Sequence, residues 1–215
     1  MKLSAKKADP KSYWDGYARK FDAIYSHRKS RVGNMLDKIF RRDMYQRFEF
    51  SMKESEPVAS RTFLDVGCGT GWYSLELAKR RARKVVGIDL STRMLMIARE
   101  RLEEEGVVDF LEADFMEYEP GEAFNVVIAV GLMDYLEDPL PALIKMRAWT
   151  NDKCILSFPR ARTARTLLRR VRLRLKRCPV YFYSPERVDR LLKEAGFKDY
   201  KMETIGQLYC VSAIV

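Results

Sequence analysis

The sequence predicts an α/β protein built on a doubly wound, mainly parallel sheet. Between residues 62 and 90, an apolar run, a glycine-rich turn, a helical pattern and a second apolar run ending on Asp89 follow one another. This order is half of a nucleotide-binding α/β sheet. Three more apolar runs alternate with helical patterns along the rest of the chain, at 107–113, 124–130 and 154–158.

The glycine-rich turn and its two flanking acids indicate the kind of ligand. The glycines are spaced G-x-G-x-G, and Trp72 stands where a dinucleotide site requires Gly or Ala. Asp65 leads into the turn, and a carboxylate there repels a pyrophosphate but suits an ammonium group. Asp89, at the end of the second strand, is placed to accept hydrogen bonds from two ribose hydroxyls. A ligand with an ammonium group, a ribose and no phosphate is S-adenosylmethionine.

Two motifs in register carry a family resemblance. Residues 64–71, LDVGCGTG, resemble motif I of the class I S-adenosylmethionine-dependent methyltransferases, and residues 87–91, GIDLS, resemble the family's ribose-binding motif. The resemblance implies a Rossmann-like seven-stranded sheet of order 3-2-1-4-5-7-6 with the last strand antiparallel. It also implies N-terminal helices, a helical cover after strand 5, and S-adenosyl-L-methionine as the cofactor. The implied cofactor-binding residues are Asp65, Gly67, Cys68, Gly69, Gly71, Asp89, Leu90, Asp114, Phe115, Val130 and Tyr17.

The composition limits the number of domains, the kind of partner and the kind of site that the chain can have. A chain of 215 residues fits one domain with an appendage, and its net charge of +10 permits nucleic acid, an anionic small molecule or an anionic membrane face as a partner. The four cysteines are scattered, so we expect free thiols in a reducing cytoplasm. The single histidine, His27, argues against a multi-histidine metal site, and we expect no metal. The N-terminus has no apolar signal region, and no apolar run reaches membrane-spanning length.

The first sixty residues are expected to form a helical cap, and 61–215 the methyltransferase core. Aromatic residues at helical spacing predict a helix over 12–25 that packs on the sheet edge. The resemblance offers a second interpretation, in which this helix covers the cofactor, with Tyr17 at the cofactor and Tyr13 at the substrate. A second amphipathic helix is predicted over 32–48. Its basic face, which includes Arg42 and Arg47, is expected to be solvated, and a polar linker is expected over 51–61.

The strands after the second are expected to supply the remaining cofactor contacts. Ser91 is a good N-cap for a helix that we expect to run to Glu105. The third strand ends at Asp114 and Phe115, which the resemblance places against the adenine; a simple turn carboxylate is the less favoured alternative for Asp114. After the fourth strand, the loop at its carboxyl end carries Asp134 and Tyr135. These two are the candidates for acting on a substrate proton.

The end of the chain contains the most unusual stretch. A turn at 151–153 should lead into the fifth strand, and the insert 160–177 follows as a basic amphipathic helix without any acid. We expect it to cover the substrate, with Arg165 and Arg169 as substrate contacts; a solvated helix, a nucleic-acid surface and a membrane surface are the alternatives. Ser184 then predicts the start of a helix that stops at Gly196, followed by strands over 199–204 and 208–215.

These expectations define the predicted function. The chain is expected to be an S-adenosylmethionine-dependent methyltransferase of a small amphipathic or anionic acceptor, with O-methylation favoured. Its arrangement resembles the small-molecule methyltransferases of the ubiquinone, menaquinone and magnesium-protoporphyrin kind. The alternative is a protein that acts on RNA or at an anionic membrane surface through its basic helices.

Overall fold

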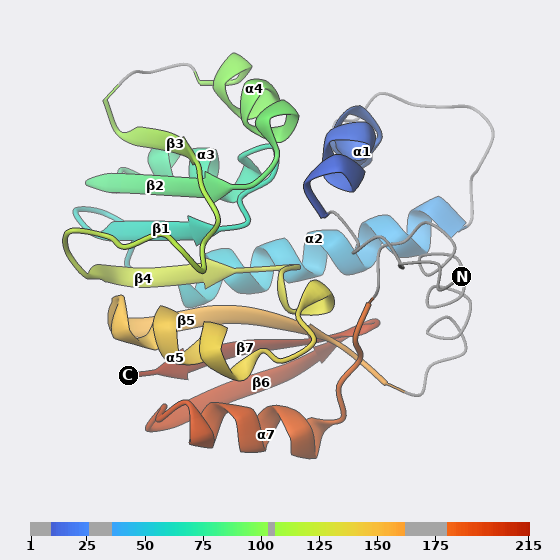
Figure 1. The fold of residues 1–215 in the computed structure, drawn as a ribbon, viewed down its shortest axis with the longest axis vertical. Coiled ribbons are helices and arrows are strands. Elements are labelled where there is room, and N and C mark those ends of the chain that lie inside the picture. The colour runs from blue at the N-terminus through green and yellow to red at the C-terminus, as the bar shows by residue number, and fades with distance from the viewer. Residues whose placement is uncertain (1–9, 26–35, 103–105, 162–179) are drawn as a thin grey trace, which may run out of the picture.

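Seven strands form one sheet in the computed structural model, in the order β3-β2-β1-β4-β5-β7-β6 (Figure 1). The structure describes residues 10–25, 36–102, 106–161 and 180–215. Strands β1 to β5 pair in parallel, whereas β7 runs antiparallel to both β5 and β6. The predicted order and the antiparallel last strand are confirmed. The strands are β1 (Thr62–Val66), β2 (Lys84–Asp89), β3 (Val108–Glu112), β4 (Phe124–Ala129), β5 (Thr150–Pro159), β6 (Asp199–Ile205) and β7 (Leu208–Ile214).

Helices cover both faces of this sheet. One apolar cluster joins one face to the helices α5 and α7, and a second cluster joins the opposite face to α2, α3 and α4. Successive residues of β4 serve the two clusters in turn: Val127 belongs to the first and Val126 to the second. The described helices are α1 (Pro10–Tyr25), α2 (Leu36–Glu54), α3 (Trp72–Lys79), α4 (Thr92–Glu100), the 3₁₀ turn η1 (Met133–Tyr135), α5 (Leu140–Ala148) and α7 (Pro185–Glu194).

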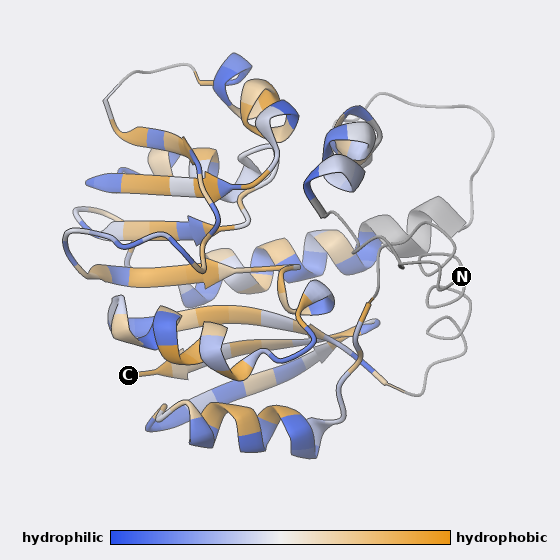
Figure 2. Cartoon of the chain, viewed as in Figure 1, coloured by the Kyte–Doolittle hydropathy of each residue, from blue (hydrophilic) through white to orange (hydrophobic). Residues whose placement is uncertain are grey.

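The central strands are apolar on both sides because helices cover both sides. All five residues of β1 are buried, including the acid Asp65. In Figure 2 the middle of the sheet is mostly hydrophobic, and α7 alternates between hydrophobic and hydrophilic residues along its length. Such double-sided burial is the pattern expected of parallel strands in an α/β protein.

Two predicted helix starts are confirmed by capping hydrogen bonds. The Ser91 hydroxyl accepts the Met94 amide at 3.2 Å, and the Ser184 hydroxyl accepts the Arg187 amide at 3.3 Å. The predicted end of the helix after Ser91 is wrong, because α4 stops at Glu100. A tight turn closes it there, with the Arg101 amide bonded to the Ala98 carbonyl at 3.2 Å.

The expected polar linker over 51–61 begins too early, because α2 continues to Glu54. Serine hydroxyls bond to carbonyls one turn back: Ser51 donates to the Arg47 carbonyl at 2.9 Å, and Ser55 donates to the Ser51 carbonyl at 2.7 Å. Phe50 and Met52 are buried against the sheet. Packing of these apolar residues therefore extends the helix into a stretch whose polarity indicated a loop.

The turn predicted at 151–153 is also wrong, since β5 begins at Thr150 and passes through these residues. Lys153 has sheet partners on both sides, Val126 of β4 and Ile214 of β7. The Val215 amide donates to the Asp152 carbonyl at 2.9 Å, which adds a further bond to this segment. Pairing with two neighbouring strands overrides the turn preference of the local sequence.

Several expectations concern residues that lie outside the described ranges. The predicted basic insert lies largely at 162–179, so Arg165 and Arg169 are outside the described residues, as is Cys178. The other three cysteines, Cys68, Cys154 and Cys210, are buried free thiols. None of the helices that the structure describes combines the length and the hydropathy that crossing a membrane requires. The division into a cap and a core stays a prediction.

Candidate cofactor and acceptor site

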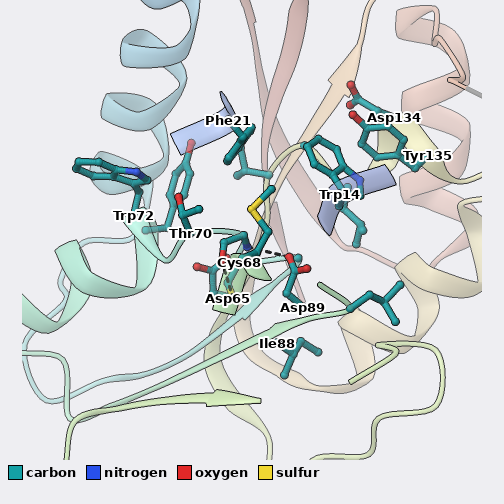
Figure 3. Close-up of a pocket in the computed structure, with 18 of the residues that line it drawn as sticks. Trp14, Phe21, Asp65, Cys68, Thr70, Trp72, Ile88, Asp89, Asp134 and Tyr135 are labelled. Atoms are coloured by element: carbon teal, nitrogen blue, oxygen red, sulfur yellow. Dashed lines mark hydrogen bonds between the residues drawn. The ribbon is translucent and has the colours of Figure 1, made fainter. Parts of the chain in front are cut away.

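A pocket of about 370 Å³ lies at the carboxyl ends of the central strands (Figure 3). In Figure 1 the arrows of β1, β2 and β4 point toward α1, which stands opposite their ends. The pocket is lined from the loops after these strands, from α1, from α2 and from η1. Ligands of open α/β sheets bind at this edge, where the strand order reverses between β1 and β4.

The glycine-rich loop after β1 is fastened to the end of β2 by its own backbone. The amides of Gly67 and Cys68 both donate to the Ile88 carbonyl, at 2.8 and 3.0 Å. The amide of Gly69 donates to Oδ2 of Asp89 at 2.8 Å, which is the dashed line in Figure 3. Gly67 and Gly69 have φ values of 70° and 55°, a region that favours glycine. Three amides of this loop therefore bond within the protein and do not point at a ligand phosphate.

Asp89 is held by backbone donors on both of its oxygens. Oδ2 accepts the Gly69 amide, and Oδ1 accepts the Ser91 amide at 2.8 Å. Burial raises the pKa of Asp89 above its ordinary value, and these two hydrogen bonds act in the opposite direction. The carboxylate lines the pocket with its orientation fixed, and each oxygen keeps a second lone pair for a hydroxyl donor.

Asp65 lines the pocket from inside the sheet and is only 3% exposed. Its Oδ2 accepts the hydroxyl of Ser74, from α3, at 2.7 Å. Burial, helped by the nearby charge of Asp89, raises the pKa of Asp65 to about 7 against the opposing effect of the Ser74 hydrogen bond. A buried acid next to a second acid favours a positively charged ligand, because a cation stabilises the ionised form of both.

Most of the predicted cofactor residues line this one pocket. Gly71 and Asp114 are not among the lining residues. A Cβ built on Gly71 would lie 2.7 Å from Cζ of Phe110, so this glycine permits close packing of the α3 start. Oδ1 of Asp114 accepts the Met116 amide at 2.9 Å, as a turn carboxylate does. The predicted residues that line the pocket are Asp65, Gly67, Cys68, Gly69, Asp89, Leu90, Phe115, Val130 and Tyr17, with Tyr13, Asp134 and Tyr135 from the acceptor predictions.

Aromatic side chains of α1 form the wall opposite the glycine-rich loop. Trp14 meets Tyr135 of η1 edge to face, with 5.4 Å between the ring centroids. Trp14 also packs edge to face on Phe21 at 5.6 Å. A Cβ built on Gly69 would lie 3.5 Å from Cε1 of Phe21, so the wall reaches across the pocket to the loop. Figure 3 shows Trp14 and Tyr135 beside Asp134, apart from the group of Asp65, Cys68 and Asp89.

Polar side-chain contacts attach α1 to the core, and no motif or spacing in the sequence indicates them. Oδ1 of Asp15 accepts the Ser91 hydroxyl at 2.6 Å and the Arg93 amide at 3.3 Å. The Ser91 hydrogen bond lowers the pKa of Asp15. Asp22 pairs with Arg101, which also donates to the Thr70 carbonyl at 3.1 Å and stacks over Trp72 at 4.6 Å.

Asp134 and Tyr135 line the pocket from the η1 turn, whose backbone accepts hydrogen bonds from the segment before α7. The phenol of Tyr183, fully buried, donates to the Met133 carbonyl at 2.9 Å. The Tyr181 amide donates to the Asp134 carbonyl at 2.8 Å. Asp134 is 4% exposed and lines the pocket. The segment that precedes α7 thus holds the backbone of η1 in place beside the pocket.

Arg47 is the residue whose position differs most from expectation. The sequence placed it on a solvated basic face of α2, yet it lines the pocket together with Met44. Its position could not be read from helical periodicity, because α2 has apolar and basic residues interleaved over the turn that faces the pocket. Arg42, one and a half turns earlier, is exposed as predicted.

Comparisons with known proteins agree with this geometry. Residues 63–152 match the family described as "Methyltransferase domain". A tRNA U34 carboxymethyltransferase of Shewanella piezotolerans is 37% identical over 42% of this chain and 28% of its own length. A ubiquinone biosynthesis O-methyltransferase of Actinobacillus pleuropneumoniae is 29% identical over 52% of this chain and 50% of its own. The chain therefore spans half or less of these curated relatives.

Solved structures extend the likeness to the whole fold. The crystal structure of magnesium protoporphyrin IX methyltransferase from Synechocystis PCC 6803 with bound SAH superposes with a TM-score of 0.74. The match covers 96% of this chain and 99% of that one at 20% identity, and at that identity it bears on the fold alone. Residues 63–152 thus match a methyltransferase domain, and the whole chain shares the fold of that solved structure.

Proposed function

We propose that the chain transfers the methyl group of S-adenosylmethionine to a small amphipathic or anionic acceptor, with O-methylation as the favoured reaction. The observation that carries the proposal is a single pocket that joins an acid-lined half to an aromatic half. When bound, the cofactor supplies a methyl group already activated on a sulfonium. The residues of the chain then have to align the acceptor and exclude water.

The acid-lined half fits the cofactor on chemical grounds. Asp89 is oriented to accept the ribose hydroxyls, and Asp65 provides the negative charge for the ammonium group. Leu90 and Phe115 line the same side and are proposed to pack against the adenine. A dinucleotide fits poorly, because loop amides that would bind a pyrophosphate donate to Ile88 and Asp89 instead.

The aromatic half supports an apolar, ring-containing acceptor. Trp14, Tyr17, Phe21 and Tyr135 line it, and such rings favour stacked or edge-to-face contacts with another ring. Tyr13 lines the same region and is proposed to contact the acceptor. Asp134 and Tyr135 are the proposed groups for removing a proton from the acceptor, since both line the pocket from η1.

A second candidate function is methyl transfer to RNA. It is favoured by the relatives that are tRNA U34 carboxymethyltransferases and by the net charge of +10. In that case the basic segment with Arg165 and Arg169 would contact the phosphate backbone of the RNA, and small acceptors would be poor substrates. The same segment could instead bind an anionic membrane surface. Phosphate-backbone binding weakens steeply with salt, which distinguishes the two functions.

The test is a methyl-transfer assay with methyl-labelled S-adenosylmethionine and a metabolite extract, with and without nuclease, at two salt concentrations. We expect label in a small-molecule product whose yield is insensitive to nuclease and changes little with salt. Label in RNA that disappears with nuclease and falls steeply with salt would support the second function instead. An absence of both label transfer and S-adenosylhomocysteine binding would overturn both.

A further inference from the structure

Arg47 projects from α2 into the wall of the pocket. A Cβ built on Gly131 would lie 3.5 Å from Nη1 of Arg47, so the guanidinium reaches the loop after β4. Its Nε is buried, and the residue as a whole is half-buried. Of the described residues that line the pocket, Arg47 is the one with a Lys or Arg side chain. A single guanidinium therefore provides the cationic character of this wall.

The neighbours of Arg47 place it in the acceptor half. Gly131 follows β4, and Cys210 lies on β7. Burial raises the pKa of the Cys210 thiol to about 12, and the charge of Arg47 acts on that thiol in the opposite direction. One turn earlier on α2, Asp43 packs on Gly206, where a Cβ would overlap the carboxylate. This part of α2 thus lies over β4 to β7, whereas Asp89 and Phe115 follow β2 and β3 on the other side.

The surroundings make the guanidinium an effective anion receptor. Met44, Leu132 and Leu136 line the same pocket, and charges attract more strongly in such apolar surroundings than in water. The planar fork of an arginine matches a carboxylate or a phosphate with two parallel hydrogen bonds. Asp134, on η1, would repel an anion, so it favours an acceptor whose anionic group is directed toward α2.

We propose that Arg47 determines acceptor specificity by binding a carboxylate or phosphate group of the methyl acceptor. The inference rests on the proposed function and narrows it to acceptors that combine an apolar ring with an anionic group. Arg47 acts in binding, so its removal raises the Michaelis constant of an anionic acceptor more than it lowers kcat.

The experiment uses small ring compounds that differ in charge, of which benzoate and benzamide have nearly equal shape. Calorimetry measures binding of benzoate, phenyl phosphate and neutral benzamide to the protein saturated with S-adenosylhomocysteine. The variants are Arg47→Gln, Arg47→Lys and the matched control Arg42→Gln, which removes the same charge from an exposed position on the same helix. We expect at least one anion to bind the parent and the control about ten-fold or more tighter than benzamide, and this preference to vanish in Arg47→Gln. Arg47→Lys should retain part of it.

Two results would overturn the inference. The parent could bind benzamide as tightly as both anions, or Arg47→Gln could keep the preference of the parent. If Arg47→Gln keeps this preference but loses about ten-fold in S-adenosylhomocysteine affinity, the guanidinium is assigned to the carboxylate of the cofactor instead. If no variant binds S-adenosylhomocysteine, the proposed function fails, and the same titrations on the cofactor-free protein still test Arg47. Thermal unfolding of each variant confirms that it is folded.

Discussion

Ser91 bonds to Asp15 across 76 residues of sequence, with its hydroxyl donating to Oδ1 at 2.6 Å. The same hydroxyl caps α4 by accepting the Met94 amide, and the Ser91 amide orients Asp89. One residue therefore joins the aromatic helix α1, the start of α4 and the proposed ribose-binding acid. This arrangement makes the position of α1 dependent on the loop that follows β2.

The first prediction concerns this link. Ser91→Ala and Asp15→Asn should each lower S-adenosylhomocysteine affinity several-fold, because α1 supplies one wall of the pocket. Ser91→Ala should also lower the free energy of unfolding by about 1 kcal/mol through loss of the N-cap. Ser184→Ala is the matched control, since Ser184 caps α7 and does not line the pocket. Calorimetry and denaturant unfolding measure the two effects, and equal affinity losses in Ser184→Ala and Ser91→Ala would contradict the link.

The second prediction concerns Asp89. Asp89→Ala removes a charged acceptor for ribose hydroxyls and also releases the Gly69 amide from the carboxylate. S-adenosylhomocysteine affinity should fall about ten-fold or more, since hydrogen bonds to charged groups contribute about 1.5–3 kcal/mol each. Asp109→Ala, an exposed aspartate on β3, is the control. A folded Asp89→Ala variant that binds the ligand as tightly as the parent would remove Asp89 from the proposed site.

The third prediction is a pH dependence that arises from Asp65. Its pKa is raised to about 7 by burial, and the ionised form is the one that attracts an ammonium group. Cofactor affinity should therefore rise between pH 6 and pH 8, and binding near pH 7 should release protons. Calorimetry in buffers of different ionisation enthalpy measures that release. Asp65→Asn should bind more weakly and show neither effect; a parent whose affinity is flat over this range would contradict the assignment.

The same shift has a consequence for stability, and its sign is opposite to that of a salt-bridged acid. Because the folded protein holds the Asp65 proton more tightly than the unfolded chain, this group stabilises the fold fully below about pH 4. That contribution is lost as the pH rises through about 7. Ligand-free protein should therefore lose stability from pH 5 to pH 8 relative to Asp65→Asn, as measured by denaturant unfolding. A difference between the two that stays constant with pH would count against the raised pKa.

The fourth prediction separates packing from binding at Gly71. Its φ is +76°, and a Cβ there would lie 2.7 Å from Phe110 and 2.9 Å from Ala98. Gly71→Ala should lower the free energy of unfolding by about 1–3 kcal/mol. Gly121→Ala, where a Cβ would meet nothing within 4 Å, should change it by less than about 0.5 kcal/mol. Phe110→Leu should partly rescue Gly71→Ala if the clash is the cause, and no rescue would leave backbone strain as the explanation.

Much of the core could be predicted because its signals are local. The two strands, the turn and the helix around the glycine-rich loop lie close together in sequence, from residue 62 to residue 89. The predicted capping serines needed only their own neighbours. The turn expected at 151–153 failed because two sheet partners, distant in sequence, decide its structure. Predictions of this kind fail where tertiary pairing competes with local preference.

The sequence indicated more of the pocket-lining residues on the proposed cofactor side than on the proposed acceptor side. Asp65 and Asp89 lie near the carboxyl ends of the adjacent parallel strands β1 and β2, so topology alone places them at one edge of the sheet. Arg47, Asp15 and Asp22 lie on helices whose rotation about their own axes is set by packing against the finished core. Their contacts join residues far apart in sequence, such as Asp22 and Arg101, and no spacing rule connects such pairs.

The glycine-rich loop is held in its final shape by Ile88 and Asp89, using bonds internal to the chain. Its conformational entropy is therefore lost during folding, and the ligand meets a rigid cradle. The helix opposite is attached differently, through side chains at Asp15 and Asp22. We therefore expect the rate at which S-adenosylhomocysteine is exchanged for S-adenosylmethionine to be limited by the breaking of these side-chain contacts. The glycine-rich loop should keep the same conformation throughout the exchange.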